Sequence, residues 1–193
     1  MRIECGATVF YGRDVAQAIG KETQRALCRN GGVELTHSTR CGVTRVHKSL
    51  FALLTCGNAG ALVTRVEYIK KTGKKNFVIV DAAMNDLIRP AFYDSFHEIV
   101  PLTKKAGAKV SSDVVGPVCE SGDYFAKDRP LPKVGEGDTL ALLSAGAYGS
   151  VMGSNYNSRS LPAEILVRGR KASVVRRRQV IADIWANEAI ADW

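Results

Sequence analysis

The run ALVTRVEYIKKTGKKNFVIV, residues 61–80, decides the fold class. Over residues 61–70 apolar side chains partly alternate with polar ones, which is typical of a strand with one buried face. The charged, glycine-containing run at residues 71–75 predicts a turn, and residues 77–80 form a short apolar strand beyond it. Residues 61–80 therefore predict a β-hairpin.

Short apolar runs between turn signals continue along the chain, at residues 97–102, 108–118, 139–144 and 163–167. Many short strands of this kind are the signature of an antiparallel β-sandwich or β-barrel. Apolar residues at helical spacing also predict a short helix near each end of the chain, after Asp14 and after Gln179. The expected fold is therefore mainly β, with a helix near each end.

The chain is basic, with 27 Lys and Arg residues against 19 Asp and Glu residues. Part of the excess lies at residues 168–178, where a nucleic-acid surface is one interpretation. Valines interleave with these charges on both sides of Gly169, however, which favours the solvated edge of a hairpin. No nucleic-acid motif supports the other interpretation, so we expect no nucleic-acid partner.

No apolar run approaches the roughly 20 residues that cross a bilayer, and the N-terminal run lacks the apolar core of a signal peptide. We therefore expect a cytoplasmic protein with no membrane partner. The five cysteines are irregularly spaced, which predicts free thiols rather than a disulfide framework. His37 and Cys41 could share a helical face, but without a second pair of ligands we expect no metal site.

Three short polar breaks carry reactive side chains beside Gly or Pro: RPAFY at residues 89–93, VCESGD at 118–123 and AGAYG at 145–149. Such breaks between strands are where a rigid sheet presents a site. A cysteine can donate a proton or act as a nucleophile, a glutamate can bind an ammonium group, and an arginine can bind a carboxylate. A single cysteine is usually a small buried apolar residue, but the setting of Cys119 favours a site.

Residues 57–188 resemble the C-terminal domain of the diaminopimelate decarboxylases, which are pyridoxal-phosphate enzymes of the alanine racemase-like fold. Ornithine and arginine decarboxylases share this scaffold, but the CESGD and MNDLIRP strings are similar to the diaminopimelate branch. The resemblance divides the chain into an unassigned segment, residues 1–56, and a β-domain, residues 57–193. The matching motifs follow in the family's order: GNAG at 57–60, TRV at 64–66, Asp81, MNDLIRPA at 84–91, GPVCESGD at 116–123, GAYG at 146–149, SNYNSR at 154–159 and PAE at 162–164.

This resemblance implies decarboxylation of meso-2,6-diaminoheptanedioate to L-lysine, a step of lysine biosynthesis that depends on pyridoxal 5'-phosphate. It implies that Cys119 donates the proton and that Glu120 binds the ammonium group at the far end of the substrate. Arg89 and Tyr93 would bind the distal carboxylate, and Tyr148 would contact the cofactor and the substrate. The resemblance also implies a homodimer, because in the family the Cys-bearing loop completes the active site of the neighbouring subunit.

Family members also carry an N-terminal (β/α)8 barrel that holds the cofactor through a lysine and a glycine-rich phosphate site. Such a barrel needs about 250 residues, whereas 56 residues precede the match, and neither Lys21 nor Lys48 lies in a setting that resembles the family's lysine motif. We therefore expect a truncated chain without the barrel, inactive alone, which is a decarboxylase either by descent only or after complementation by a separate barrel chain. The alternative is a non-catalytic β-domain that serves dimerisation or regulation.

Overall fold

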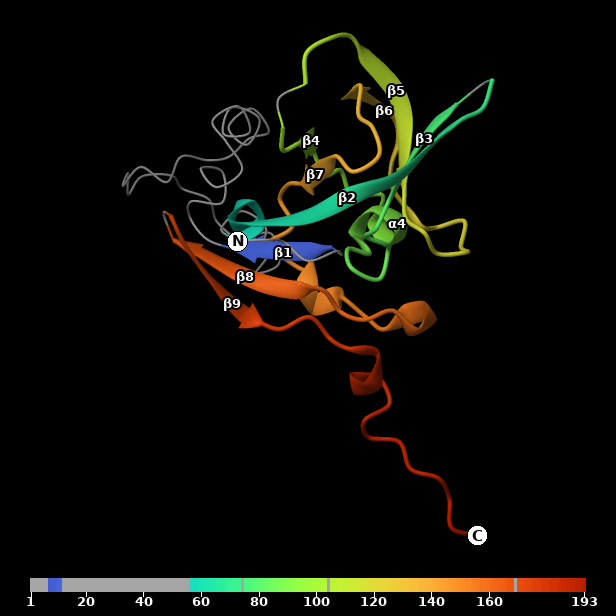
Figure 1. Ribbon diagram of the computed structural model, residues 1–193, viewed down its shortest axis with the longest axis vertical. Helices are drawn as coiled ribbons and strands as arrows, with labels where there is room; N and C mark the ends of the chain where they lie inside the picture. Colours follow the sequence, from blue (N-terminus) through green and yellow to red (C-terminus); the bar gives the residue numbers. More distant parts are fainter. Residues whose placement is uncertain (1–6, 12–55, 74, 104, 169) are drawn as a thin grey trace, which may run out of the picture.

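A long strand, β2 (Gly60–Lys71), runs through the centre of the sheet (Figure 1). Its second half pairs antiparallel with β3 (Asn76–Val80), so the predicted hairpin is confirmed. Its first half pairs with β1 (Thr8–Tyr11) on one side and with β7 (Thr139–Leu142) on the other. The computed structural model describes residues 7–11, 56–73, 75–103, 105–168 and 170–193, and the helix predicted after Asp14 lies outside them.

The sheet has the strand order β6-β5-β3-β2-β1-β8-β9, and β4 joins it by pairing with β7. The pairs β1/β8 and β3/β5 are parallel, whereas the others are antiparallel. The mainly β fold is therefore confirmed, but the sheet is mixed rather than purely antiparallel. Among the described strands, the outer β6 and β9 do not pair with each other, so no closed barrel forms. The remaining bounds are β4 (Ile99–Pro101), β5 (Lys109–Val115), β6 (Tyr124–Pro132), β8 (Ala163–Arg168) and β9 (Lys171–Arg176).

Most of the predicted strands are present. The four apolar runs that follow the hairpin contain β4, β5, β7 and β8, and the basic run forms the antiparallel hairpin β8–β9, as predicted. Two strands were missed. Strand β6 contains Pro130 and Pro132, which are tolerated because β6 lies at the edge of the sheet. Strand β1 falls within the segment that the sequence left unassigned.

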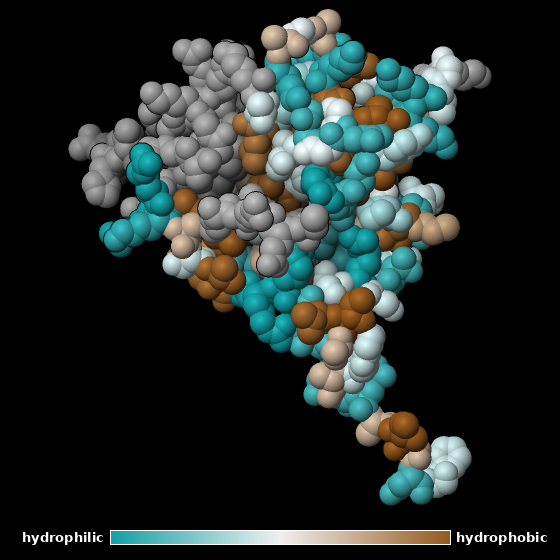
Figure 2. All heavy atoms as spheres, in the orientation of Figure 1, coloured by the Kyte–Doolittle hydropathy of each residue, from teal (hydrophilic) through white to brown (hydrophobic). Residues whose placement is uncertain are grey.

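The helical part of the described chain differs from the expectation. One short α-helix, α4 (Arg89–Tyr93), has Pro90 in its first turn and ends at Asp94, whose φ is 51°. The prediction of a helix after Gln179 is wrong, because only the single 3-10 turn Ile181–Asp183 forms there. Beyond it the chain extends away from the sheet (Figures 1 and 2) and leaves Trp185 about half exposed. A short helix without a packing partner is marginal in water, which explains the error.

The hydrophobic core is formed mainly by side chains of β2, β3, β5, β6 and β7. Its largest side chains come from both halves of the sheet, and their burial holds the ends of β3, β5 and β7 in fixed positions. None of the helices in the described residues is long and apolar enough to cross a membrane. Core residues from these strands are Leu62, Val66, Val78, Val80, Val114, Phe125, Leu140 and Leu142.

Candidate active site

Strand pairing brings two site loops to the same edge of the sheet. Strands β3 and β5 are parallel neighbours, so residues 81–88, which follow β3, and residues 116–123, which follow β5, leave from the same end. The second of these loops is closed by the β5–β6 pairing, where Val115 lies opposite Tyr124. The sequence segments that were singled out separately are therefore adjacent because of the sheet topology.

Asp123 joins these two loops. Its Oδ1 accepts a hydrogen bond from the Met84 backbone N–H and its Oδ2 accepts one from the Val118 N–H, each at 2.7 Å. The side chain is buried, and burial raises the pKa of this carboxyl group above its ordinary value. Asp123 was not among the predicted site residues, although it ends the CESGD string.

Cys119 and Glu120 lie exposed at the tip of the 116–123 loop, so the thiol is open to a small molecule. Oε1 of Glu120 accepts from the Gly122 N–H at 3.0 Å and from the Ser121 hydroxyl at 3.1 Å. These hydrogen bonds, that of Gly122 first, hold the pKa of Glu120 below its usual value. Glu120 is therefore an ionised carboxylate in a fixed orientation beside a thiol, which suits the binding of an ammonium group.

A third loop reaches Glu120 from the β7–β8 connection. The Tyr156 hydroxyl lies 3.4 Å from Oε2 of Glu120, in a 3-10 turn that spans Tyr156–Ser158. No role had been predicted for Tyr156, although it lies in the SNYNSR string. The turn is fixed to the 81–88 loop by Asn85, whose side-chain Nδ2 donates to the Ser154 carbonyl at 3.1 Å and whose backbone carbonyl accepts from the Ser154 N–H at 3.0 Å.

Arg89 and Tyr148 form a second cluster. The Arg89 guanidinium carbon lies 5.8 Å from the centre of the Tyr148 ring, a cation–π contact. Nη2 of Arg89 is 3.4 Å from the Ser95 hydroxyl, and its buried Nε has no hydrogen-bond partner among the described residues. Tyr148 has a φ of 60°, a conformation that an aromatic residue adopts only when its surroundings hold it there. This cluster suits the binding of a carboxylate near a flat ring.

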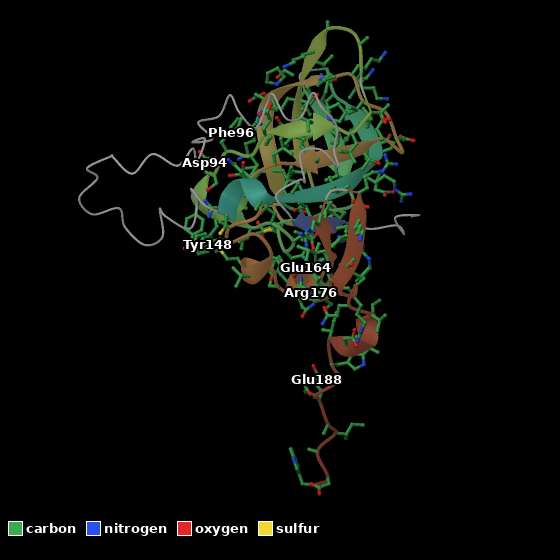
Figure 3. The ribbon with its side chains drawn as sticks, turned by 90° about the vertical axis from the view of Figure 1, so that its left-hand side faces the viewer. Asp94, Phe96, Tyr148, Glu164, Arg176 and Glu188 are labelled. Carbon is green, nitrogen blue, oxygen red and sulfur yellow. The ribbon has the colours of Figure 1, made fainter. Side chains whose placement is uncertain are left out.

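Among the described contacts, none joins the Tyr93 ring to Arg89 or Tyr148. It is exposed on α4 and its ring packs edge-on against Phe92, with the ring centres 4.9 Å apart. Phe96 is also exposed and is covered on one face by Arg129, at 4.0 Å. Figure 3 shows Phe96 on the same side of the molecule as Tyr148. The exposed rings of Phe92, Tyr93 and Phe96 together form an aromatic surface.

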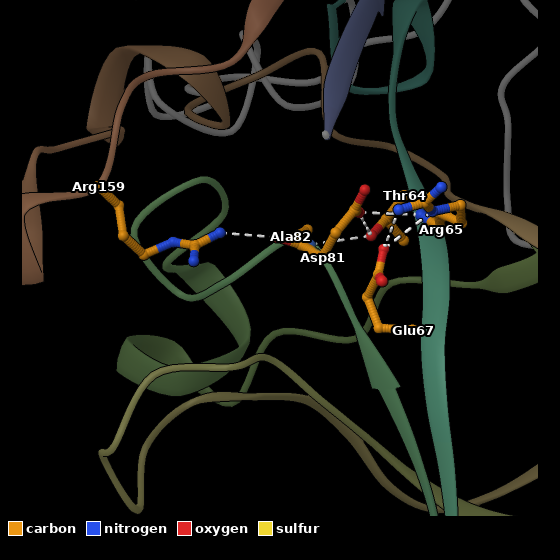
Figure 4. A network of polar contacts seen from close by, with 6 residues as sticks. All are labelled: Thr64, Arg65, Glu67, Asp81, Ala82 and Arg159. Carbon is orange, nitrogen blue, oxygen red and sulfur yellow. Dashed lines mark hydrogen bonds and ion pairs between the residues drawn. The ribbon is translucent and has the colours of Figure 1, made fainter. Parts of the chain in front are cut away.

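A network of polar contacts behind the site holds the start of the 81–88 loop (Figure 4). Asp81 Oδ1 accepts from the Thr64 hydroxyl at 2.5 Å and from the Arg65 N–H at 2.9 Å. Arg159 crosses to this loop from the end of the 154–159 string. Its Nη2 donates to the Asp81 carbonyl at 2.6 Å and its Nε to Asn85 Oδ1 at 3.2 Å. All these residues lie in the matching motifs, which was the only signal for them.

Asp86 lies in the same loop, with its side chain turned into the protein. It is buried, and burial raises its pKa to about 6, although its Oδ2 accepts the Ala83 N–H at 2.9 Å. Within the residues that the structure describes, no group of three or more His, Cys, Asp or Glu side chains is arranged to hold a metal ion. The thiols of Cys56 and Cys119 form no disulfide.

The chain matches the family model described as the pyridoxal-dependent decarboxylase C-terminal sheet domain, over residues 10–146. It is 52% identical over 133 residues to the diaminopimelate decarboxylase of Vibrio cholerae, covering 69% of this chain and 32% of the relative. For the diaminopimelate decarboxylase of Pseudomonas aeruginosa the identity is 53% over 133 residues, with 69% and 32% covered. The chain thus spans about a third of the length of these curated relatives.

Solved structures give the same result. The crystal structure of diaminopimelate decarboxylase from Helicobacter pylori complexed with L-lysine matches with a TM-score of 0.65 and 44% identity, covering 70% of this chain and 33% of that one. The diaminopimelate decarboxylase of M. jannaschii matches with a TM-score of 0.68 and 38% identity, covering 70% and 31%. The similarity therefore extends from the sequence motifs to the arrangement of the strands.

Proposed function

Because this chain belongs to the pyridoxal-dependent decarboxylases through their C-terminal sheet domain, we propose that it serves the decarboxylation of meso-2,6-diaminoheptanedioate to L-lysine. In this proposal it provides the proton donor and the groups that bind the far end of the substrate. The observation that carries the proposal is the exposed pair Cys119–Glu120, whose carboxylate is held ionised by three hydrogen bonds. The name and the bound L-lysine of the Helicobacter pylori structure support this substrate class.

Each residue acts through its own chemistry. The Cys119 thiol gives its proton to the carbon from which carbon dioxide has departed. The Glu120 carboxylate binds the distal ammonium, and the Arg89 guanidinium, backed by the Tyr148 ring at 5.8 Å, binds the distal carboxylate by charge-assisted hydrogen bonds. Tyr93 contributes its hydroxyl from α4, at the exposed aromatic surface. We assign contact with the cofactor to Tyr148.

Among the described residues, we assign one contact with the cofactor, that of Tyr148. Pyridoxal phosphate, when bound, supplies an electron sink for the carbanion that decarboxylation leaves. The half-buried ring of Tyr148, fixed at a φ of 60°, offers a surface for a flat ring. The loops at residues 81–98, 116–123 and 143–162 contain no lysine, however. We therefore assign the cofactor-holding lysine to residues outside these loops.

The remaining parts of the proposal concern assembly and location. Exposed Phe92, Tyr93 and Phe96, at 67%, 57% and 64% exposure, support a homodimer in which this surface is covered. The biosynthetic role supports a location in the cytoplasm. The same aromatic surface favours the second candidate function, a non-catalytic dimerisation or regulatory module, because association through this surface requires no cofactor.

The proposal is tested by complementation. The chain is co-expressed with the barrel part of the Vibrio cholerae relative, and release of carbon dioxide from meso-2,6-diaminoheptanedioate is measured. We expect cofactor-dependent release that falls at least a hundredfold in Cys119→Ala, whereas Cys56→Ala serves as the matched cysteine control and retains it. Absence of release, when the relative's own C-terminal part restores activity in the same arrangement, would favour the non-catalytic module.

A further inference from the structure

We propose that Asp123 is a positioning residue for Cys119 and Glu120. Its carboxylate holds the loop that carries them against the loop that leads to Arg89. The inference rests on the proposed function, because it concerns the same site. Asp123 is 4% exposed, so its role is to fix the loop rather than to touch the substrate.

The Asp123 carboxylate and the two backbone N–H groups that donate to it, those of Met84 and Val118, form a clasp that requires two acceptor oxygens. The backbone N–H groups of Met84 and Val118 each donate to a different oxygen of the Asp123 carboxylate, both at 2.7 Å. An asparagine in this place has one acceptor oxygen and turns its NH2 group toward the second donor. One of the two N–H groups then loses its acceptor, which is unfavourable in a buried position. Asp123→Asn therefore opens the clasp although it hardly changes the volume of the side chain.

The space around the carboxylate is equally restrictive. A Cβ atom added at Gly116 would lie 2.5 Å from Oδ1 of Asp123 and 2.7 Å from its Cγ, so the carboxylate keeps its place only beside a glycine. Gly116→Ala therefore displaces the carboxylate without changing its charge or its acceptors. Two substitutions of different chemistry thus perturb the same clasp.

The clasp determines where Cys119 lies. The N–H of Val118, which precedes Cys119, donates to the Asp123 carboxylate, and the backbone carbonyl of Glu120, which follows Cys119, accepts from the Asp123 N–H at 3.1 Å. On the other side of the clasp, Met84 precedes Asn85, which holds the loop of Tyr156 through Ser154. Glu120 is therefore held from both sides, and release of Asp123 frees Cys119 and Glu120 to move relative to Arg89.

The test is made on the whole chain, with two measurements. Hydrogen exchange should become at least tenfold faster at one of the Met84 and Val118 amides in Asp123→Asn, which leaves one donor without an acceptor, and at both amides in Gly116→Ala, which displaces the whole carboxylate. The rate at which iodoacetamide alkylates Cys119 should change at least threefold in both variants. Asp138→Asn is the matched control, because that carboxylate accepts the Gly135 N–H at 2.8 Å in a turn outside the site. It should leave both measurements unchanged.

In the complemented enzyme, assayed below the unfolding transition of each variant, we expect Asp123→Asn to lower kcat/KM at least tenfold and Asp138→Asn to leave it unchanged. Wild-type exchange and alkylation in a folded Asp123→Asn variant would overturn the proposal, and Gly116→Ala decides if Asp123→Asn does not fold. If the wild-type complement is inactive but the variants of the chain still show the faster exchange and the changed alkylation rate, the proposed function is contradicted and the positioning role is supported.

Discussion

Replacement of Gly146 by alanine should destabilise the protein strongly. Gly146 lies where the loop after β7 passes the 3-10 turn Gly57–Ala59. Its N–H donates to the Gly57 carbonyl at 2.9 Å, and the N–H of Ala145 donates to the Gly60 carbonyl at 2.9 Å. A Cβ atom at Gly146 would overlap the Cys56 carbonyl oxygen and lie 2.7 Å from the Gly60 nitrogen. These are backbone atoms, so the two segments must separate.

The size of the effect follows from these contacts. Forcing an extra carbon into a packed site costs about 1–3 kcal/mol, and each of the two hydrogen bonds contributes about 1 kcal/mol net. We therefore expect Gly146→Ala to lower the free energy of unfolding by about 3–5 kcal/mol, a large share of the roughly 5–15 kcal/mol of a typical domain. Urea unfolding followed by circular dichroism measures it.

The matched control is Gly135→Ala. An added Cβ at Gly135 meets no atom within 4 Å, so the free energy of unfolding should stay within about 0.5 kcal/mol of the wild type. Equal unfolding midpoints for Gly146→Ala and the wild type would refute the close approach of the β7 loop to the turn. An equally large loss in Gly135→Ala would show that the effect is not specific to this contact.

The folded-state pKa of Asp86 is about 6, against an ordinary value of 3.8, so the folded protein holds this proton more tightly than the unfolded chain does. Asp86 therefore contributes stability below about pH 4, and this contribution is lost as the pH rises through 6. Two pKa units correspond to about 3 kcal/mol of unfolding free energy. Asp86→Asn should remove this component, which urea unfolding at pH 4 and pH 7.5 would show, and an unchanged difference between the two pH values would contradict it. Cys119 should be alkylated by iodoacetamide without denaturant. Complete protection of Cys119 in the native chain would show instead that it is a buried residue of the core. Tyr156→Phe should change the free energy of unfolding by less than about 0.5 kcal/mol, because its contact with Glu120 is exposed and 3.4 Å long; a larger loss in thermal unfolding would indicate a structural role. Borohydride reduction with pyridoxal phosphate should trap no stoichiometric adduct on a single lysine of the chain alone, and mass spectrometry that finds one would show that the chain holds the cofactor.

The sequence predicts the local parts of the fold well and its long-range parts poorly. The β2–β3 and β8–β9 hairpins are visible because alternation and turn residues lie within a few positions of each other. The parallel pairs β1/β8 and β3/β5 join segments that are distant along the chain, so no local pattern announces them. The segment after Gln179 has the spacing of an amphipathic helix but leaves the sheet, so packing rather than spacing decided its structure.

The candidate site shows the same division. Arg89, Glu120 and Tyr148 were selected from strings that resemble a family, and the structure places Arg89 beside Tyr148. Cys119 is exposed, but its role stays a prediction, as does the division of the chain at residue 57. The clasp of Asp123 could not be predicted, because its partner Met84 lies 39 positions away and contributes only a backbone N–H.

Strand β1 has a consequence for synthesis of the protein on the ribosome. It lies between β2 and β8, and its register places Thr8 opposite Ala163, 155 positions later in the chain (163 minus 8). At translation rates of about 5–20 residues per second, β1 emerges roughly 8–30 seconds before its parallel partner. During that time the edge of β1 that later pairs with β8 lacks this partner strand. Unpaired strand edges of this kind can aggregate or recruit chaperones. Among the described strands, the first to be made is thus among the last to be fully paired.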